Sequence, residues 1–419
     1  MRYEVYLEFT DGFTLDSPQK GVLDVDVLGY VTQQVDAPIY SINAQRGKSR
    51  ELDKYTTGSC VIVFDNRDRF FEPTQSLTPS PSDVYPGRRI SVKMFNTKTN
   101  SYVRDVFNGY TNDWVYDYSM SGDATATVTC VDALSILANK EIVNPIVCPA
   151  ETSGKRISRI LANGQVNFPA SDAVIDPGNT ILAAESVTGN ALQYLQKVEL
   201  TEQGQLFVDG FGNLRFLERQ IAFGSFLTFN NYAPQALSFY DVELAFSNDT
   251  LVNFLEATAS VGTAVASNPN SINDYQIRSQ QYETLHNNIT ELEYFADYIV
   301  DEYSEPEYRI RSLTVNVETP PFPRSNLPER LKNDIFKQIL DRTDIGALAR
   351  PSFYPGKITD PDVAINAIDP GFSWISGITH NITLDRHDIT LNFTKAIGLF
   401  YFRLDDRRFG ILNRNVLGF

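Results

Sequence analysis

The first 140 residues alternate between apolar and polar positions, which is the pattern of half-buried β-strands. Between residues 3 and 9 the apolar side chains fall on the odd positions. Residues 60–64, Cys-Val-Ile-Val-Phe, form a continuous apolar run that stops at a polar turn. The proline-rich residues 73–86 cannot join a sheet ladder and predict a loop. The pattern predicts a first β-barrel domain over residues 1–140.

A helical period replaces this alternation in the next part of the chain. Leu192, Leu195 and Val198 fall on one helical face, with spacings of three and six residues. Gly204 follows where the end of a helix is expected. The change of period predicts a mainly helical insertion or linker domain over residues 141–204.

Strand patterns return after this insertion. Residues 206–208 and 214–217 flank a five-residue, glycine-rich loop, which is a hairpin signal. Near the other end of the chain, residues 378–384 and 389–393 are two strand-like runs separated by a short polar turn. These segments predict a second β-barrel domain over residues 205–395.

One helix is expected inside the second barrel domain, at about residues 291–304. Its apolar side chains recur at helical spacing, and Thr290 with Glu293 forms a capping box before them. Residues 396–419 are apolar and aromatic with basic interruptions, and they predict a C-terminal docking tail. The expected fold class is therefore mainly β with α insertions, built from two β-barrel domains with helical decoration.

Composition agrees with a β-rich protein of several domains. A chain of 419 residues has room for two to four domains, and its 27 Phe and 21 Tyr favour pleated, half-buried surfaces. The 36 Lys and Arg against 52 Asp and Glu leave a net charge of −16, whereas nucleic-acid backbones are bound by clustered positive charge. The charge argues against specific DNA binding and fits a surface that DNA passes without sticking.

No targeting or membrane segment is predicted. The N-terminal residues alternate in polarity and lack the apolar stretch of a signal peptide, and no segment approaches the ~20 apolar residues of a membrane span. Cys60, Cys130 and Cys148 are odd in number and widely spaced, so neither a disulfide framework nor a zinc site is expected. This cysteine usage fits assembly in a reducing cytoplasm.

Recognisable catalytic motifs are absent from the sequence. His380 and His387 flank the turn of the last predicted hairpin, where a solvated loop pair is favoured over a metal or proton-transfer site. His286 stands alone before a helix, and no HExxH, GxSxG or P-loop pattern occurs. A carboxylate pair for glycoside cleavage stays open, because such a pair needs no local motif. We expect no catalytic residue, cofactor or metal.

Two further features admit a binding role. The run Asp65-Asn66-Arg67-Asp68-Arg69 resembles a calcium loop, but it lacks the glycine and the distal glutamate of an EF-hand. A strand-ending turn whose Asp and Asn side chains bond their own backbone is favoured. Exposed Tyr side chains can stack on sugars, but core packing and subunit interfaces use the same residues. Sugar binding remains a minor alternative.

A series of short motifs between residues 46 and 134 is more specific than composition. In chain order these are Arg46-Gly47-Lys48-Ser49, Gly58 with the run Cys60 to Phe64, Asp65-Asn66-Arg67-Asp68-Arg69-Phe70, Pro73, Pro86-Gly87, Phe107-Asn108-Gly109 and Asp132-Ala133-Leu134. In order and spacing they resemble the minor tail proteins, or baseplate hub proteins, of siphophages. The resemblance makes ten residues candidates for structural or interface roles: Arg46, Gly47, Asp65, Asn66, Arg67, Asp68, Phe70, Pro73, Pro86 and Gly87.

The second half of the chain extends the resemblance. Residues 274–279, 296–307 and 311–315 are similar to the second-barrel region of the family, and residues 404–419 are similar to its usual ending. Tyr275-Gln276 stands where family members often carry Tyr-Gly, and the segment near residues 341–345 departs from the family pattern.

The resemblance implies a structural protein of the virion tail tip, assembled in the host cytoplasm. Such hubs carry two tail-tube-like barrels per subunit, so a homotrimer presents six barrels to a sixfold tail, without catalytic residues in this core. The implied partners are further copies of the chain, the distal tail protein, the tape measure protein and other tail-tip proteins, with DNA only in transit through a lumen. The alternatives are a distal tail protein that forms a hexameric ring, and a glycan-binding or glycan-cleaving tail-tip protein.

Overall fold

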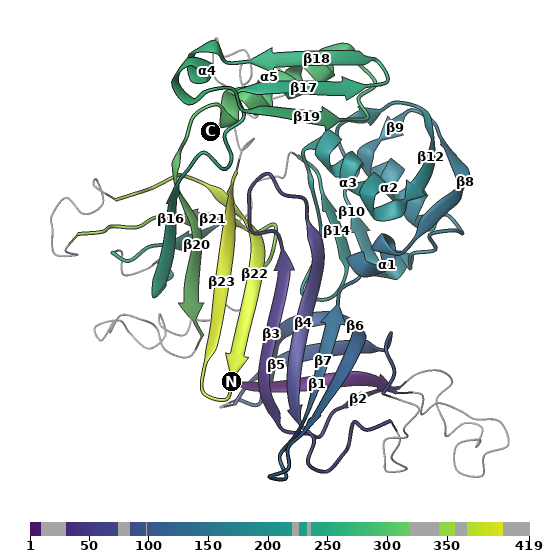
Figure 1. Ribbon diagram of the computed structural model, residues 1–419, viewed down its shortest axis with the longest axis vertical. Coiled ribbons are helices and arrows are strands. Elements are labelled where there is room, and N and C mark those ends of the chain that lie inside the picture. The colour runs from purple at the N-terminus through teal and green to yellow at the C-terminus, as the bar shows by residue number, and fades with distance from the viewer. Residues whose placement is uncertain are drawn as a thin grey trace.

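Strands dominate the fold, and short helices are grouped in two regions beside them (Figure 1). The mainly β fold with α insertions that the sequence predicts is therefore confirmed. The computed structural model describes residues 1–9, 31–73, 84–97, 99–219, 226–232, 236–317, 343–356 and 367–396.

Among the described residues, the largest sheet contains thirteen strands from both halves of the chain. Its N-terminal strands are β1 (Arg2–Phe9), β2 (Val31–Gln34), β3 (Ile39–Gly47), β4 (Thr56–Asp65), β5 (Arg89–Asn96), β6 (Ser101–Tyr118) and β7 (Ala124–Val131). Its C-terminal strands are β15 (Leu227–Phe229), β16 (Asp241–Phe246), β20 (Tyr308–Asn316), β21 (Leu348–Pro351), β22 (Ser373–Thr383) and β23 (His387–Lys395). The main path runs in the order β16-β20-β23-β22-β3-β4-β7-β6-β5-β1-β2, and β21 joins β15 to β22.

The alternation in the sequence corresponds to the two faces of this sheet. Along β7 every second side chain, from Ala124 to Cys130, is buried, and the residues between them are half-buried. In β1, Val5 and Leu7 are each 1% exposed, as their positions in the pattern predict. The apolar run in β4 ends in the same core, where Phe64 is fully buried.

Antiparallel pairing of β3 with β22 joins the two halves of the sheet. Seven residue pairs are in register, from Gly47 opposite Gly377 to Ser41 opposite Thr383. Strands expected in two separate barrels therefore share one sheet and one core. Within the described ranges neither barrel is closed, and the main path ends at two edge strands, β16 and β2.

An α/β unit with its own core follows β7. It contains α1 (Leu134–Ala138), β8 (Glu141–Cys148), β9 (Glu151–Thr152), α2 (Ser153–Ala162), β10 (Ala173–Ile175), β11 (Ile181–Leu182), β12 (Glu185–Asn190), α3 (Ala191–Glu202), β13 (Gln205–Val208) and β14 (Leu214–Leu217). The expected helical segment, residues 141–204, thus holds α2 and α3 together with five short strands. These strands are two to eight residues long, and most are too short to produce a clear period of two. The predicted hairpin is present as β13 and β14.

A second, smaller unit packs one helix on a three-stranded sheet (Figure 1). It contains β17 (Phe254–Ala259), β18 (Gly262–Ser267), α4 (Pro269–Tyr275), β19 (Ser279–Glu283) and α5 (Ile289–Tyr303). The helix predicted at residues 291–304 is confirmed as α5, but its predicted capping box is wrong. The side chain of Asn288 caps the helix by accepting a hydrogen bond from Thr290 N at 2.9 Å, which places Thr290 inside the first turn.

The last predicted hairpin is confirmed as β22 and β23, but the environment expected for its histidines is wrong. His380 lies within β22, and β23 begins two residues earlier than the pattern indicates, at His387, so both histidines lie in strands and are each 1% exposed. His380 Nδ1 lies 3.0 Å from His387 Nε2, and Tyr3 Oη lies 2.7 Å from His387 Nδ1. Burial lowers the pKa of His387 to about 3, so the buried histidines are neutral.

Three other expectations have simple outcomes. The three cysteines are buried free thiols, and Cys60 and Cys130 face each other across β4 and β7. None of the described helices has the length and apolar content needed to cross a membrane. The expected docking tail, residues 396–419, lies outside the described residues apart from Ala396.

Two glycines with positive φ allow the β3–β22 contact to be tested. A Cβ at Gly47 (φ +89°) would lie 2.2 Å from the carbonyl oxygen of Ser376, whereas a Cβ at Gly87 (φ +86°) would meet nothing within 4 Å. We expect Gly87→Ala to cost about 1–2 kcal/mol, because its only penalty is the left-handed backbone. Gly47→Ala should cost clearly more, because β3 and β22 must also separate.

Chemical denaturation of the two variants would measure this difference in the free energy of unfolding. Equal losses would contradict the conclusion that close approach of the two strands, rather than backbone conformation alone, requires glycine at position 47.

Candidate functional site

Arg46 is a buried connection between three parts of the fold. It lies near the end of β3 and is 2% exposed. Its Nη1 donates a hydrogen bond to Val208 O at 3.1 Å, and its Nη2 lies 3.1 Å from Asp344 Oδ1. The other oxygen of Asp344 accepts a hydrogen bond from Gly210 N at 3.0 Å. One guanidinium group therefore ties β3 to the β13–β14 hairpin and to the segment before β21.

Residues 65–70 form a tight turn at the opposite end of β4. The Asp65 carboxylate accepts hydrogen bonds from Arg67 N and Nε at 3.0 Å, and these bonds lower the pKa of Asp65 to about 2. Asn66 is 1% exposed, and its Oδ1 accepts a hydrogen bond from Phe71 N at 3.1 Å. Asp68 is exposed. The prediction of a strand-ending turn, with Asp and Asn side chains bonded to the local backbone, is confirmed.

Phe71 anchors this turn in the core. The residue is fully buried. Its ring stacks on Trp114 with 5.3 Å between centroids and lies tilted against Phe64 with 4.6 Å between centroids. The candidate Phe70 is half-buried and meets Phe71 edge-on at 4.9 Å. The adjacent candidate Pro73 is exposed. The sequence motif names Phe70, and the aromatic side chain that anchors the turn is the next residue, Phe71.

Pro86 and Gly87 form a third, separate site on an exposed turn before β5. Gly87 N donates a hydrogen bond to Thr111 O at 2.6 Å, which pins the turn to β6. Arg46 and Asp65 lie near opposite ends of the β3–β4 pair, roughly 25 Å apart at ~3.3 Å per residue. The ten candidate residues thus occupy three places and do not converge on one catalytic centre.

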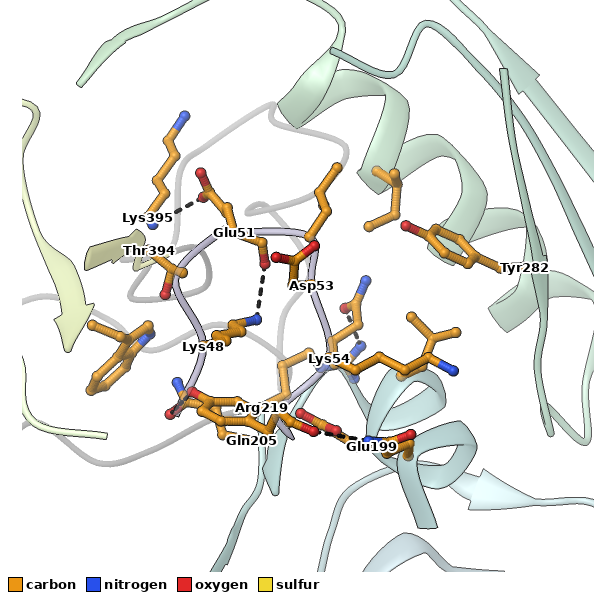
Figure 2. A pocket seen from close by; sticks show the side chains of 18 of the residues that line it. Lys48, Glu51, Asp53, Lys54, Glu199, Gln205, Arg219, Tyr282, Thr394 and Lys395 are labelled. Atoms are coloured by element: carbon orange, nitrogen blue, oxygen red, sulfur yellow. Dashed lines mark hydrogen bonds between the residues drawn. The ribbon is translucent and has the colours of Figure 1, made fainter. Parts of the chain in front are cut away.

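A cavity of about 200 Å³ opens where the β3–β4 loop meets α3, α5 and the end of β23 (Figure 2). Its walls come from the large sheet, the α/β unit and the smaller helix-on-sheet unit. The aromatic side chains that line it are Tyr55, Tyr282, Phe295, Tyr298, Tyr303 and Trp374.

Glu51 joins the walls of this cavity. Its Oε1 accepts a hydrogen bond from Lys395 N at 2.9 Å, drawn in Figure 2, and lies 3.5 Å from Tyr303 Oη. Its other oxygen forms an ion pair with Arg309. No local pattern marks Glu51 in the sequence, because these partners lie 252 to 344 positions further along the chain.

Two charged residues of opposite sign also line the cavity: Lys48 is half-buried and Glu199 is buried. Lys48 Nζ donates a hydrogen bond to Glu51 O at 2.9 Å and lies 5.0 Å from the centroid of the Tyr55 ring. Burial lowers the pKa of Lys48. Burial raises the pKa of Glu199 to about 7, although the charge of Lys48 and a 3.3 Å hydrogen bond from Leu206 N oppose the shift.

The polar groups around Arg46 also include the buried carboxylate of Asp132. Asp132 is 1% exposed and accepts hydrogen bonds from Gly58 N at 2.8 Å and Leu134 N at 3.0 Å. Burial raises its pKa to about 7, against the effect of these two bonds and of the Arg46 charge. Within the described ranges, no cluster of three or more His, Cys, Asp and Glu side chains is arranged to hold a metal ion.

The buried pair of Arg46 and Asp344 yields a stability prediction. We expect Arg46→Met to lower the free energy of unfolding by about 3 kcal/mol, because it removes the Arg46 partner from Asp344 and leaves Val208 O without its donor. This expected loss lies at the lower end of the usual range for breaking a buried ion pair, because 30% of the Asp344 side chain is exposed. Arg67→Met is the matched control: its side chain is 61% exposed and should matter much less. Equal losses in urea denaturation would contradict the assignment.

Glu199 yields a prediction on pH dependence. Because its pKa rises from about 4.3 in an unfolded chain to about 7, protonation favours the folded state. That stabilisation is fully present below pH ~4 and is lost as the pH rises through about 7. Between pH 4 and 8, Glu199→Gln should therefore gain stability relative to the original chain, by about 4 kcal/mol at most.

Urea titrations at a series of pH values would measure the gain. Glu283→Gln is the control, since it removes the same charge from a side chain that is 76% exposed. A difference between Glu199→Gln and the original chain that does not change with pH would contradict the raised pKa.

Comparisons with known proteins give a likeness of fold. No protein-family model and no curated protein matches the chain. Among solved structures, the tail protein from Neisseria meningitidis MC58 aligns with 94% of this chain and 97% of its own, at 10% identity and a TM-score of 0.57. The 43 kDa tail protein of prophage MuSo2 from Shewanella oneidensis aligns with 95% of this chain and 98% of its own, at 12% identity and a TM-score of 0.54.

Both matches span nearly all of this chain and nearly all of the matched protein. They therefore concern the whole arrangement of sheet and flanking units, rather than one common motif. The resemblance that the motifs between residues 46 and 134 predict is confirmed at the level of the fold: this chain has the fold of phage tail proteins.

Proposed function

We propose that the protein is a structural, non-enzymatic component of a phage tail tip. In this proposal it forms a hub ring that joins the distal tail to the tip proteins and lines the channel for the tape measure protein and DNA. The observation that carries the proposal is a likeness of fold to two tail proteins, one of them from a prophage, that extends over nearly the whole chain. Dispersion of the candidate residues over three sites, each bonded to its own surroundings, supports a structural rather than a catalytic use of the motifs.

The proposed assembly is a homotrimer. Each chain contributes an N-terminal group of strands, β1–β7, and a C-terminal group, β15, β16 and β20–β23, to one sheet. Three copies would present six such groups, which matches the sixfold symmetry of a tail. We propose that the tube-like barrels are completed between subunits, because an open edge strand is a ready template for a neighbouring chain.

The edge at β16 supports this view. Phe246 on β16 is 67% exposed and Tyr308 on β20 is 49% exposed, and their rings lie 6.3 Å apart between centroids. Two large apolar side chains beside each other at the end of a sheet favour a contact surface over solvent exposure. The candidate turn residues at Asp65–Phe70 and Pro86–Gly87 would then serve neighbouring contacts of the same ring.

The negative charge of the protein supports the proposal that DNA passes through the channel without binding to it. Residues 249–307 contain eleven Asp and Glu against Arg278 alone, a net charge of −10 out of −16 for the chain. On α5, Glu293, Asp297 and Asp301 are exposed at intervals of four residues, so they share one helix face. Such a surface repels phosphate.

The proposed location is the virion tail tip, with assembly in the host cytoplasm. The proposed partners are the distal tail protein, the tape measure protein and other tip proteins.

The oligomeric state tests the proposal. We expect a trimer by sedimentation and threefold symmetry in averaged images of the purified protein. Phe246→Lys should weaken assembly roughly tenfold to a hundredfold, the equivalent of about 1.5–3 kcal/mol for a buried Phe, with little effect on folding. Val265→Lys is the control, because this side chain is 60% exposed on β18, which belongs to a different sheet from β16.

Other outcomes would support the alternatives. Sixfold rings would indicate a distal tail protein, and a monomer at all concentrations would contradict a ring of either kind. Binding or clearing of host cell-wall glycans that is abolished by substitution of exposed tyrosines or carboxylates would indicate a glycan-binding or glycan-cleaving tip protein. Equal effects of Phe246→Lys and Val265→Lys on assembly would contradict the placement of β16 in the subunit interface.

A further inference from the structure

The strand β18 forms the outer edge of the smaller helix-on-sheet unit. It pairs with β17, and in the described part of the chain no other strand lies beside it. Figure 1 shows it at the top of the molecule, with β17 and β19 between it and the rest of the chain. A strand edge of this kind presents a row of N–H and C=O groups with which a further strand can pair.

The phase of the β17–β18 ladder determines which backbone groups point outward. Asn268 N donates a hydrogen bond to Asn253 O at 2.9 Å, one step beyond the register of the two strands, so these residues form a hydrogen-bonded pair. Such pairs alternate with pairs whose backbone groups point away from the partner strand. The N–H and C=O groups of Thr263, Val265 and Ser267 therefore point to the free edge, and all three residues are exposed.

This edge has none of the features that usually block a strand edge. β18 reads Gly-Thr-Ala-Val-Ala-Ser, without proline or a charged residue, and its register with β17 has no bulge. The strand β8 is different, because it contains Pro145 and because Val143 N and Asn144 N donate to Gln165 Oε1 at 3.0 and 2.8 Å. The contrast favours pairing of β18 with a partner strand.

The acidic side of α5 lies beside the same edge. A Cβ on Gly262, at the start of β18, would lie 3.3 Å from Ile289 Cδ1, which places Ile289 next to β18. Glu293 and Asp297 follow Ile289 at intervals of four residues, so the three side chains share one side of the helix. Both acidic side chains are exposed.

Phe295 marks the other side of α5. Its ring lies 6.1 Å from the ring of Tyr282 on β19. Glu293 and Asp297 are each two positions from Phe295, which is about 160° around the helix, so they point away from β19 and toward the β18 side. Burial, and then the charges of Asp301 and Glu293, raise the pKa of Asp297. A cation brought to this side would relieve the repulsion between these carboxylates.

We propose that β18 accepts an extended, basic segment of a partner protein as a fourth strand of the smaller unit. Main-chain hydrogen bonds to Thr263, Val265 and Ser267 hold this segment in place. Every second side chain of the added strand faces α5, and lysine or arginine at these positions pairs with Glu293 and Asp297.

The inference goes beyond the proposed ring and does not depend on it. The partner is a different protein, because a second copy of a chain with a net charge of −16 would bring further negative charge to an acidic unit. With Glu293 and Asp297 neutralised, residues 249–307 keep a net charge of −8 out of −10, so the unit still repels phosphate.

Binding of a model peptide to the full-length chain tests the backbone part of the proposal. The probe is a fluorescent peptide of about eight residues that alternates lysine and valine, and its anisotropy gives the Kd. Val265→Pro should weaken binding about tenfold, because it removes one outward N–H at an edge position where proline is tolerated. Val265→Thr keeps this N–H and is the matched control, which should bind like the original chain.

The acidic side of α5 is tested separately and without a change of backbone, which also decides the case in which Val265→Pro fails to fold. Glu293→Lys combined with Asp297→Lys should weaken binding about tenfold or more. The control, Glu283→Lys combined with Glu305→Lys, makes the same change of charge at exposed positions away from the β18 side of α5. It should weaken binding only about twofold, because salt screens distant charges.

Four results would overturn the proposal. The first is no binding of the probe by the original chain, and the second is unchanged binding by a folded Val265→Pro variant. The third is an equal loss in the two charge variants, or equally tight binding of a peptide that alternates lysine and proline, since either result would indicate attraction of charge without strand pairing. The fourth is amide protection of β18 that rises with the concentration of the protein alone, which would identify a second copy as the occupant.

Discussion

The structure depends on the pairing of β3 with β22, because this pairing makes one sheet from strands at the two ends of the chain. Its seven residue pairs connect residues 41–47 with residues 377–383. Closing a loop of this length is entropically costly, so the contact must be supported by many others. That support comes from the shared core, in which Ile42 of β3 and Ile378 of β22 are each no more than 1% exposed.

Buried polar groups make this junction specific as well as stable. Arg46 and Asp344 bring the α/β unit to the end of β3, and Glu51 brings β20, β23 and α5 to the loop that follows. Tyr3, His387 and His380 form a third polar chain between the first strand and the last hairpin. Buried groups of this kind contribute little net stability, but they strongly penalise arrangements in which their partners are missing. The relative placement of the units is therefore fixed by a few long-range bonds.

The same arrangement separates the surfaces that an assembly would use. The large sheet ends at β16 and β2, whereas most of the net negative charge lies on the smaller unit with α5 at its exposed face. The cavity lies between these regions, at the point where the sheet and both flanking units meet. The hub role proposed above would need this combination of a rigid frame, edge strands that neighbours can contact and a surface that repels phosphate.

The sequence by itself determined those features whose causes are local. The period of two in β1 and β7, the helical stripe of α5, the β13–β14 and β22–β23 hairpins and the turn after Asp65 all follow from neighbouring residues. Tertiary structure decided the rest: the joining of the described strands of both halves into one sheet, the burial of His380 and His387, and the meeting of Arg46 with Asp344. Each of these depends on contacts between residues that are distant in the chain, and a local pattern of polarity contains no information about which distant strand becomes the neighbour.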